Sequence, residues 1–361
     1  MRVKIQLKQI ASYSKGSQIN GDKLVVSGVY DYLNGGVAPS GKWDAFNTPG
    51  GTVTISEGGN SCGYVNYMRE PFWCGAHCYY LFDTIRNSEY LYYALKSQQE
   101  RLMGIRTGAC MPNIKKADLG RFEITYDTDE QQQEYVVSIL RKVESIIAAR
   151  QQQLIELDNL IKARFVELFG DPKYNKSNLV KIGEIGALTS GGTPSRAKPE
   201  YFEGDVRWYS AGELNSLYLS DSVEHISEMA LQQSSAKLFN KGTLMIGMYD
   251  TAAFKMGILT EDSSSNQACA NLNPKQGYNI VWLYYLFDIM KPIFLQERQG
   301  VRQKNLSLSK IKEFEVPFAP FELQDQFAAF VEQTDKSKVV VQKAVSENAN
   351  TAFIWGGQHY A

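Results

Sequence analysis

The sequence lacks the long apolar runs that membrane proteins need. No apolar run reaches the roughly 18 residues of a membrane-spanning helix. The first residues, Met1 to Ile5, alternate apolar and basic side chains and lack the apolar core of a secretory signal peptide. The sequence therefore predicts a cytoplasmic protein.

Cysteine and histidine are scarce. The five cysteines form an odd set, which argues for reduced thiols rather than a disulfide framework. The stretch Cys74-Gly-Ala-His77-Cys78 suggests a zinc site, but no second pair of close cysteines completes it. Cys78 and Cys269 occupy matching positions in the internal repeat described below, among small and apolar residues. We therefore predict buried core thiols there and no metal site.

An excess of positive charge is also missing. The 38 basic and 39 acidic residues give a net charge of −1, so no overall basic surface indicates nucleic acid binding. This balance weighs against a protein that holds DNA alone. It is compatible with a protein that reads bases while a partner supplies phosphate contacts.

Recognisable catalytic motifs are absent. We find no Walker A loop and no Asn-Pro-Pro-Tyr-like stretch of adenine methyltransferases, and Gly58 to Gly63 lack the strand-to-helix setting of a cofactor loop. The three histidines have no serine or cysteine partner in a known motif. We expect a chain without catalytic residues.

A long helix is predicted between Asp129 and Phe169, because this stretch contains no glycine or proline. Apolar residues recur in it at seven-residue intervals, at Leu140, Ile147, Leu154, Ile161 and Leu168. Such a stripe is typical of a helix that pairs with another helix, and its length is roughly 60 Å at 1.5 Å per residue. Thr128 with Gln131 matches a capping box at the start, and Gly170 with Pro172 indicates the end.

The chain repeats itself after this helix. Leu91-Tyr92-Tyr93 reappears as Leu283-Tyr284-Tyr285, 192 positions later, and Phe122-Glu123-Ile124 matches Phe314-Glu315-Val316. Pro320 then precedes a second helical pattern that carries Phe327 and Phe330 on its apolar side and corresponds to the first helix. The start of the first copy is shorter than that of the second.

Each copy combines predicted strands with predicted helices. Thr52–Ile55, Gly242–Ile246 and Gly257–Thr260 are typical of strands. Leu91–Met103 and Ile280–Glu297 are predicted helices, the second kinked or broken by Pro292. The predicted fold is mixed α/β, with two similar globular domains separated by two long helices in an antiparallel coiled coil and a pseudo-twofold internal repeat.

The stretch from Leu157 to Pro172 resembles the central conserved region of the specificity subunit of type I restriction-modification enzymes. Ser190-Gly-Gly-Thr-Pro-Ser195, Asn266-Gln-Ala-Cys-Ala270 and Gln303-Lys-Asn-Leu306 resemble the same family in the expected order. The resemblance covers nearly the whole chain, from about residue 5 to 345. It implies target-recognition domains at 1–127 and 171–319, spacer helices at 128–170 and 320–349, and a tail at 350–361.

In that family the subunit is noncatalytic, and each domain reads half of a bipartite double-stranded DNA site. The helices set the spacing of the halves and bind adenine methyltransferase subunits, two of them by the resemblance, with restriction and translocase subunits joining. This chain is then expected to hold no cofactor, with S-adenosylmethionine, ATP and Mg²⁺ on the partners. The alternative is a coiled-coil scaffold or dimerisation protein that does not bind DNA.

Candidate DNA contacts are polar or aromatic residues in glycine-rich or basic segments, the side-chain types that meet phosphates and base edges. In the first domain they are Tyr30, Asn34, Lys42, Trp43, Arg106, Lys115 and Lys116. In the second domain they are Gly192, Thr193, Ser195, Arg196, Lys198, Tyr249, Asp250, Lys255, Arg298, Arg302, Gln303 and Lys304. The competing interpretations are a solvated turn at 190–198, a hairpin loop with Phe254 buried at 249–255, and a charged solvated loop at 298–305.

Overall fold

The computed structural model describes residues 2–25, 27–84, 87–108, 110–298 and 305–360, without the side chains of 349–360. The chain divides into two compact units. Unit 1 comprises Met1–Gln152 and Gln342–Ala361, and unit 2 comprises Gln153–Val341. Among the described residues, no helix combines the length and apolar character that crossing a membrane requires.

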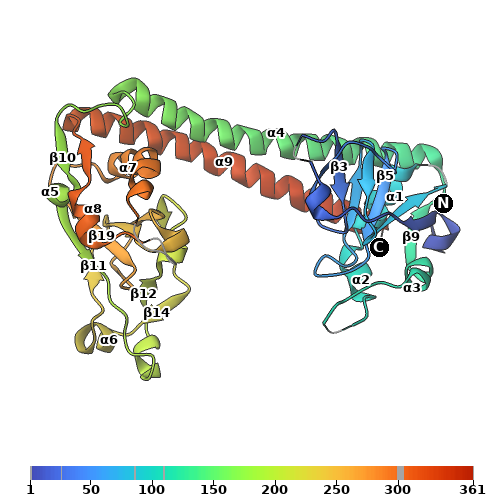
Figure 1. Cartoon of the computed structure of the whole chain (residues 1–361), viewed down its shortest axis with the longest axis horizontal. Helices are drawn as coiled ribbons and strands as arrows, with labels where there is room; N and C mark the ends of the chain where they lie inside the picture. The colour runs from blue at the N-terminus through green and yellow to red at the C-terminus, as the bar shows by residue number, and fades with distance from the viewer. Residues whose placement is uncertain (1, 26, 85–86, 109, 299–304, 361) are drawn as a thin grey trace. The chain divides into compact units, whose positions relative to one another are not determined.

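Unit 1 contains three sheets, with strand orders β2-β8-β5-β6, β4-β3-β7 and β1-β9 (Figure 1). Its strands are β1 (Arg2–Gln6), β2 (Ser12–Lys15), β3 (Tyr30–Leu33), β4 (Gly41–Trp43), β5 (Thr52–Ser56), β6 (Val65–Met68), β7 (Phe72–Cys74), β8 (Cys78–Phe82) and β9 (Glu123–Asp127). Its shorter helices are the 3-10 helices η1 (Leu7–Gln9) and η2 (Gly21–Lys23), and α1 (Ser88–Lys96), α2 (Gln99–Gly104) and α3 (Lys116–Arg121).

Unit 2 follows the same plan, with sheets β11-β19-β16-β17-β13, β14-β12-β18-β15 and β10-β20. Its strands are β10 (Leu179–Lys181), β11 (Gly186–Ser190), β12 (Val206–Tyr209), β13 (Tyr218–Leu219), β14 (Glu224–Ile226), β15 (Leu238–Phe239), β16 (Leu244–Gly247), β17 (Met256–Leu259), β18 (Ser263–Ser265), β19 (Cys269–Pro274) and β20 (Glu315–Pro317). Its shorter helices are α5 (Ile182–Ile185), α6 (Glu228–Gln233), α7 (Ile280–Phe294) and α8 (Leu308–Glu313), with 3-10 helices η3 (Pro199–Phe202), η4 (Ala211–Glu213), η5 (Asp250–Ala252) and η6 (Leu295–Glu297).

Matching strand pairs show that the two units are copies of one fold. Strand β3 pairs with β7 in parallel and with β4 antiparallel, and β12 pairs with β18 and β14 in the same two ways. Cys78 and Cys269, which occupy matching positions in the repeat, were predicted to be buried thiols. Each is buried in its own unit, which confirms that prediction. The repeat seen in the sequence is therefore a repeat of structure.

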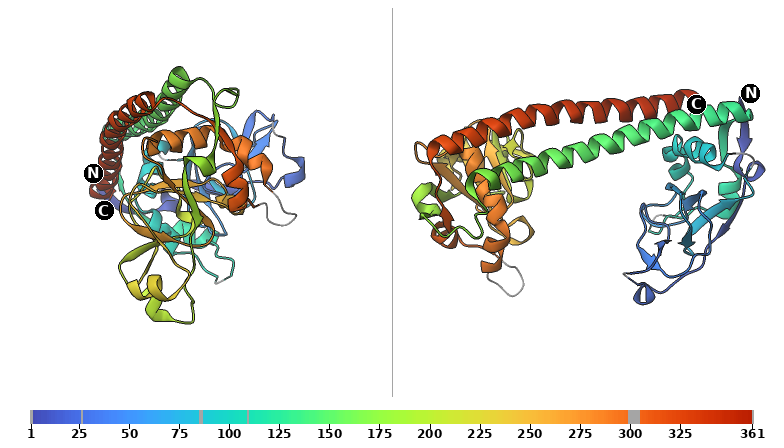
Figure 2. Two further views of the ribbon diagram at one scale, coloured as in Figure 1. Left: turned by 90° about the vertical axis from the view of Figure 1, so that its left-hand side faces the viewer. Right: turned by 90° about the horizontal axis from the view of Figure 1, so that it is seen from above.

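The two long helices are α4 (Glu130–Phe169) and α9 (Phe321–Tyr360). In unit 2 they pack side by side in opposite directions, as Figure 2 shows: the rings of Phe165 and Phe327 are 5.2 Å apart, and Lys338 Nζ lies 2.6 Å from Asp158. The sequence predicted a helix to residue 349 followed by a separate tail, whereas the structure continues α9 to Tyr360.

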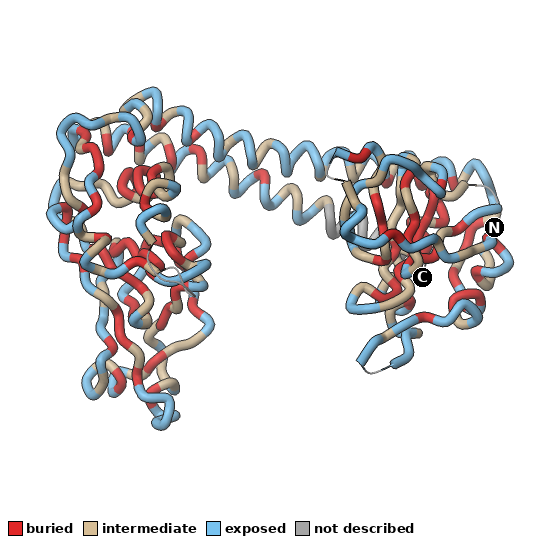
Figure 3. The backbone as a smooth tube through the Cα atoms, in the orientation of Figure 1, coloured by how far each residue is buried: buried red, intermediate tan, exposed pale blue. Residues whose placement is uncertain are grey.

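The heptad stripe of α4 divides between the two cores. Leu140 is buried in the core of unit 1, and Ile161 is buried in the core of unit 2 with Phe327. Ile147 and Leu154 are half-buried, while Leu168 and Phe330 pack against the unit 2 core from its edge. In Figure 3 buried residues concentrate in the sheets of each unit, and much of α4 is exposed.

A buried glutamine joins each long helix to its own unit. Gln133 donates to Asp127 O at 2.6 Å and accepts from Asn87 N, while Gln324 donates to Ala319 O at 2.7 Å and accepts from Asn279 N. Gln133 and Gln324 are 191 positions apart, one fewer than the 192 that separate Leu91 from Leu283. The two long helices are therefore aligned by their buried glutamine side chains, with an offset that differs by one residue from that of the rest of the repeat.

Residues at the ends of the helices can be compared with the caps and breaks that the sequence predicted. Gly170 adopts the predicted left-handed conformation, with φ +73°, and its N–H bonds Val166 O. At the start of α4, next to the predicted cap residue Thr128, the Asp129 carboxylate accepts the N–H of Gln132. Pro292 lies inside α7, two residues before its end, where the loss of one hydrogen bond is tolerable.

Candidate nucleic-acid interface

Three of the unit 2 segments that were predicted to contact DNA meet at one end of its main sheet, together with the loop at Gln267. The Thr193 hydroxyl donates to the Gln267 side chain, Met248 N bonds Ala268 O at 2.9 Å, and Leu306 N bonds Met248 O at 2.8 Å. Residues 190–193, 248–255, 266–268 and 305–306 thus form one surface, here called loop cluster 2. Loops held on a rigid sheet are a common setting for binding residues.

The glycines of the Ser190-Gly-Gly-Thr-Pro-Ser segment are required for packing. A side chain at Gly191 would lie 2.2 Å from Ser265 O, and one at Gly192 would lie 1.9 Å from Ser235 O. The Trp208 indole also donates to Gly192 O at 3.0 Å. Gly192 therefore holds the loop against neighbouring backbone, and Thr193 contributes a side-chain hydrogen bond to loop cluster 2.

Arg196 and Lys198 turn away to the second sheet of the unit. Arg196 forms a bidentate pair with Glu224, Nη2 to Oε2 at 2.7 Å, and its guanidinium lies 4.2 Å from the Phe202 ring centre. The hydrogen bond from Arg196 lowers the pKa of Glu224 below its usual value. Lys198 donates to Tyr201 at 2.9 Å. Ser195, like Arg196, is exposed.

The segment from Tyr249 to Lys255 is the hairpin between β16 and β17. Phe254 is buried with φ +53°, as the hairpin interpretation predicted, and Asp250 N donates to the Asn305 side chain at 3.0 Å. Lys255 Nζ lies 3.4 Å from Gly212 O. Tyr249 is 40% exposed and faces a hollow of about 520 Å³ that Asn305 and Lys310 also line. The ammonium of Lys310 is paired with Glu297 at 2.7 Å, so the exposed ring and the amide are the groups of this hollow suited to a base edge.

Unit 1 carries a corresponding surface, here called loop cluster 1, which is formed by residues 34, 57–58, 77, 107 and 113–114. Asn113 forms bridges to Gly58 and Thr107, and Ile114 N bonds Glu57 O at 2.9 Å. The Glu57 carboxylate pairs with Lys15 at 2.5 Å and lies 3.6 Å from His77 Nδ1. Asn34, a predicted contact, belongs here, but its side-chain oxygen accepts the N–H of His77.

Exposed cations flank loop cluster 1. Arg106, Lys115 and Lys116 are exposed, and none of them forms an ion pair with any part of the chain that the structure describes. Lys115 precedes α3, and the ammonium of Lys116 lies 5.6 Å from the Tyr13 ring centre. Free cations beside a polar loop are suited to backbone phosphates.

Three predicted contacts of unit 1 lie elsewhere. Tyr30, Lys42 and Trp43 belong to the sheet β4-β3-β7, where Lys42 Nζ lies 3.6 Å from Asp31. In unit 2, Arg298 is half-buried and its Nε donates to Leu295 O at 3.0 Å. The predicted contacts Arg302, Gln303 and Lys304 lie outside the described residues.

The sequence analysis missed several residues of these surfaces. Gln267, which bonds Thr193, and Lys237, whose Nζ donates to Ser190 O at 2.9 Å, were not predicted. Gln267 had a signal, because it lies in Asn266–Ala270, one of the stretches that carry the family resemblance. Lys15 and Glu57 had none, since 42 positions separate them in the chain.

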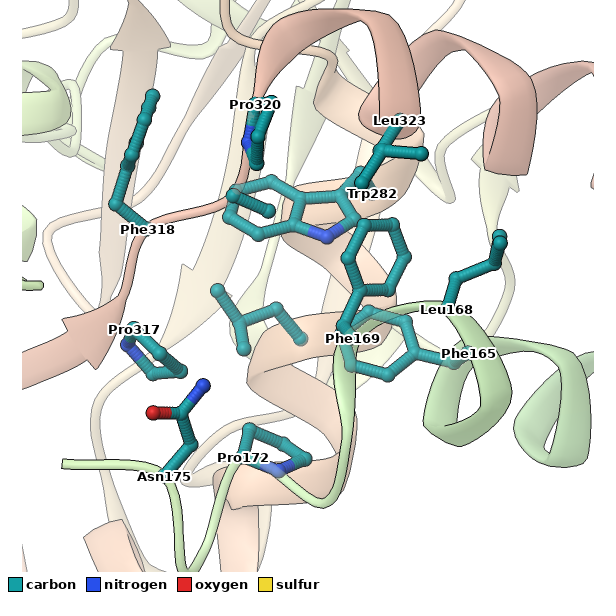
Figure 4. Close-up of a pocket in the computed structure, with 12 residues that line it drawn as sticks. Phe165, Leu168, Phe169, Pro172, Asn175, Trp282, Pro317, Phe318, Pro320 and Leu323 are labelled. Atoms are coloured by element: carbon teal, nitrogen blue, oxygen red, sulfur yellow. The ribbon is translucent and has the colours of Figure 1, made fainter. Parts of the chain in front are cut away.

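An apolar cavity of about 160 Å³ lies at the junction of α4, α7 and α9 in unit 2 (Figure 4). Phe169, Trp282, Pro317 and Leu323 line it, and no cation does. Its chemistry does not suit a phosphate backbone, so it is separate from the loop clusters. Across the part of the chain that is described, no three His, Cys, Asp or Glu side chains converge as metal ligands would.

Comparison with known proteins places these features in a family. The family model for the type I restriction modification DNA specificity domain matches the chain twice, at residues 3–159 and 174–348. A Mycoplasma genitalium chain assigned as a type I specificity subunit is 29% identical over 225 residues, 57% of this chain and 57% of that protein. The type I restriction enzyme MjaIX specificity subunit of Methanocaldococcus jannaschii is 28% identical over 186 residues, 48% of this chain and 43% of that protein. The chain thus spans about half the length of these relatives.

Solved structures show the same fold. The crystal structure of a type I restriction-modification S subunit from M. genitalium has a TM-score of 0.61 at 21% identity, covering 100% of this chain and 96% of that one. A chain from work on complex assembly and conformational transition of the type I restriction-modification system has a TM-score of 0.63 at 13% identity, covering 99% and 97%. The resemblance seen in the sequence is confirmed. The chain belongs to the type I restriction modification DNA specificity domain family.

Proposed function

We propose that this chain is the noncatalytic DNA sequence-specificity subunit of a type I restriction-modification complex. Residues 1–127 and 171–319 are the target-recognition domains, and each reads one half of a bipartite site. Residues 128–170 and 320–349 are spacer helices, which set the distance between the halves and bind methyltransferase subunits. Residues 350–361 have no assigned role.

The observation that supports this proposal is that one fold is present twice and that the two copies carry different side chains at their loop clusters. Both clusters carry an asparagine, but loop cluster 1 is flanked by the cations Arg106, Lys115 and Lys116, whereas loop cluster 2 presents the exposed ring of Tyr249. Cations position a protein on phosphates, while amides and rings distinguish base edges. Two similar domains with different contact chemistry fit a site made of two different halves.

Within this proposal, the residues expected to contact DNA are those whose side chains are exposed, together with Thr193 and Lys255, which are half-buried. They are Arg106, Lys115, Lys116, Thr193, Ser195, Tyr249, Asp250 and Lys255. Gly192, Arg196 and Lys198 support the loops through internal contacts, which leaves them an indirect part in recognition. A chain with net charge −1 then relies on partner subunits for much of its phosphate contact.

The long helices carry a surface suited to partner subunits. Within unit 2, Ile155 and Leu160 of α4 are 53% and 49% exposed, and Val339 and Val340 of α9 are 63% and 68% exposed. Exposed apolar residues mark protein interaction sites when they form a contiguous patch, and these four lie on the two paired helices of unit 2. We assign this surface to adenine methyltransferase subunits, two by the resemblance to the family. S-adenosylmethionine, ATP and Mg²⁺ then act on the methyltransferase and restriction subunits.

The experiment is to express the chain with an adenine methyltransferase subunit of its complex in cells without adenine methylation. Sequencing of methylated adenines should reveal one bipartite motif with a fixed spacer. Replacing residues 171–319 with the matching domain of the M. genitalium relative should change one half of the motif and leave the other unchanged.

A matched control replaces residues 1–127 instead and should change the other half. Intact methylation after deletion of residues 180–315 would contradict the proposal. Copurification with the methyltransferase but no methylated motif would favour the coiled-coil scaffold.

A further inference from the structure

The sheet β4-β3-β7 of unit 1 has an aromatic outer face. Cross-strand partners share a face of a sheet, and Tyr30 pairs with Trp43 while Tyr32 pairs with Trp73. The opposite face carries Leu33, Phe72 and Cys74, which are buried together against Cys78 of the neighbouring sheet. The same face also carries Asp31 and Lys42, which are 45% and 49% exposed, so the packed part of the inner side is the apolar group around Leu33.

The outer face is only partly covered by its own chain. The segment before β3 covers Tyr32, whose hydroxyl bonds Ile19, and the Trp73 indole donates to Ser17 O at 2.7 Å. Beyond that cover, the ring of Phe46 lies 5.1 Å from Tyr30 and is 50% exposed. Tyr30, Trp43, Phe46 and Trp73, here called the aromatic face, remain partly open to solvent.

Unit 2 shows what covers the equivalent sheet. In β14-β12-β18, the matching face carries Val206, Trp208 and Ile226. These side chains pack beneath two covering segments in a separate small core, made with Tyr201 and Phe202 of η3 and with Ala230 and Leu231 of α6. Trp208 is consequently 3% exposed. The equivalent face in unit 2 is thus an interior surface closed by a helix.

Unit 1 lacks the helix that closes this face. In unit 2 the connection between β14 and β16, residues 227–243, contains α6 and β15. In unit 1 the connection between β4 and β5 is the short segment 44–51, which contains neither helix nor strand. Tyr30 and Trp43 occupy the positions of Val206 and Ile226, which pack with α6 in unit 2, and in unit 1 the ring of Phe46 covers only part of this face.

We propose that the aromatic face binds an apolar helical segment of the adenine methyltransferase subunit, which takes the position that α6 holds in unit 2. This inference rests on the proposed function and adds a second contact to the one on the long helices. The local charge favours protein over DNA. Residues 21–48 contain Lys23 and Lys42 against Asp22, Asp31 and Asp44, a net charge of −1 that would repel a phosphate backbone.

The test places a photo-crosslinking amino acid, benzoylphenylalanine, at Phe46 in the full chain assembled with the methyltransferase subunit. Illumination should join position 46 to a helical peptide of the methyltransferase, identified by mass spectrometry. The matched control carries the same amino acid at Val223, an 84% exposed apolar residue of unit 2, and should give no such product. A crosslink to target DNA or to a second copy of this chain, or no crosslink at position 46, would overturn the inference.

A second measurement uses affinity. Phe46→Asp should weaken binding of the methyltransferase subunit about tenfold or more, because a charge then faces the apolar segment. Val223→Asp should bind as the unchanged chain does. Equal affinity of Phe46→Asp, with an unchanged melting temperature, would overturn the inference. Failure of the unchanged chain to bind the methyltransferase would instead refute the proposed function.

Discussion

The carboxylate of Glu89 is the most deeply buried ionised group of unit 1 that the structure pairs with arginine. Its side chain is 2% exposed, it bonds Arg141 of α4 at 2.9 Å, and Arg69 lies 3.2 Å away. Burial alone would raise the pKa of Glu89, but its bonds to Arg141 and the charges of both arginines outweigh burial and lower it. This network ties α1 to the first third of α4.

We predict that Glu89→Gln destabilises unit 1 by about 1–3 kcal/mol at pH 7, since charged hydrogen bonds are lost. The folded pKa lies below the unfolded value of about 4.3. The Glu89 contribution is therefore complete above that value and is lost as the pH falls through the folded pKa. Hydrogen exchange of the α1 amides at pH 7 and pH 4 measures it. The control is Glu144→Gln, at the 44% exposed partner of Arg69, which should have little effect. A stability loss of Glu89→Gln that is larger at pH 4 than at pH 7 would contradict this explanation.

Residue types predicted loops better than they predicted contacts. Glycines and prolines located the segment at 190–195 and the hairpin at 249–255, and Phe254 was predicted as a buried alternative. The bonds from Thr193 to Gln267 and from Arg196 to Glu224 join residues 74 and 28 positions apart. Such pairs depend on how strands and loops are brought together in three dimensions, which periodicity and composition do not report.

The packing of α9 on α4 depends on Phe327. Its side chain is fully buried, and its ring lies 5.2 Å from Phe165, 5.9 Å from Phe169 and 5.5 Å from Tyr285. Phe327→Ala should lower the free energy of unfolding of unit 2 by about 3–5 kcal/mol, because it opens a cavity between the helices. Urea unfolding followed by tryptophan fluorescence reports it. Val340→Ala, at a 68% exposed position of the same helix, should change stability by less than about 0.5 kcal/mol, and equal losses would show that Phe327 is not the anchor.

In the long helices, apolar periodicity predicts where a helix lies but not which residues of its stripe are buried. The seven-residue stripe located α4 and its apolar side, but an α-helix drifts against a strict heptad, and Ile147 and Leu154 are only half-buried. Lys338, a charged residue of α9, lies between Asp158 and Asp335. Burial alone would lower the pKa of Lys338, but hydrogen bonds to these carboxylates raise it. A polar residue that interrupts the stripe therefore fixes the register.

For the whole molecule, the internal repeat was the most informative signal. It predicted two mixed α/β domains and two long helices, because a duplicated sequence must fold twice in the same way. It did not show that the first copy lacks a counterpart of α6, since a deletion at 44–51 looks like loop variation. Only the strand pairing shows which face that deletion uncovers.

The spacing between half-sites is the property that belongs to the molecule as a whole. Inserting seven residues into α4 after Arg150, and seven into α9 after Val341 to keep Asp158 opposite Lys338, adds about 10 Å of helix. Because a turn of DNA of about 34–36 Å holds roughly ten base pairs, the methylated motif should gain about three base pairs of spacer with both halves unchanged. Sequencing of methylated adenines measures the spacer. A three-residue insertion, which rotates one helix face away from the other, is the control and should abolish methylation; an unchanged spacer after the heptad insertions would show that the helices do not set the distance.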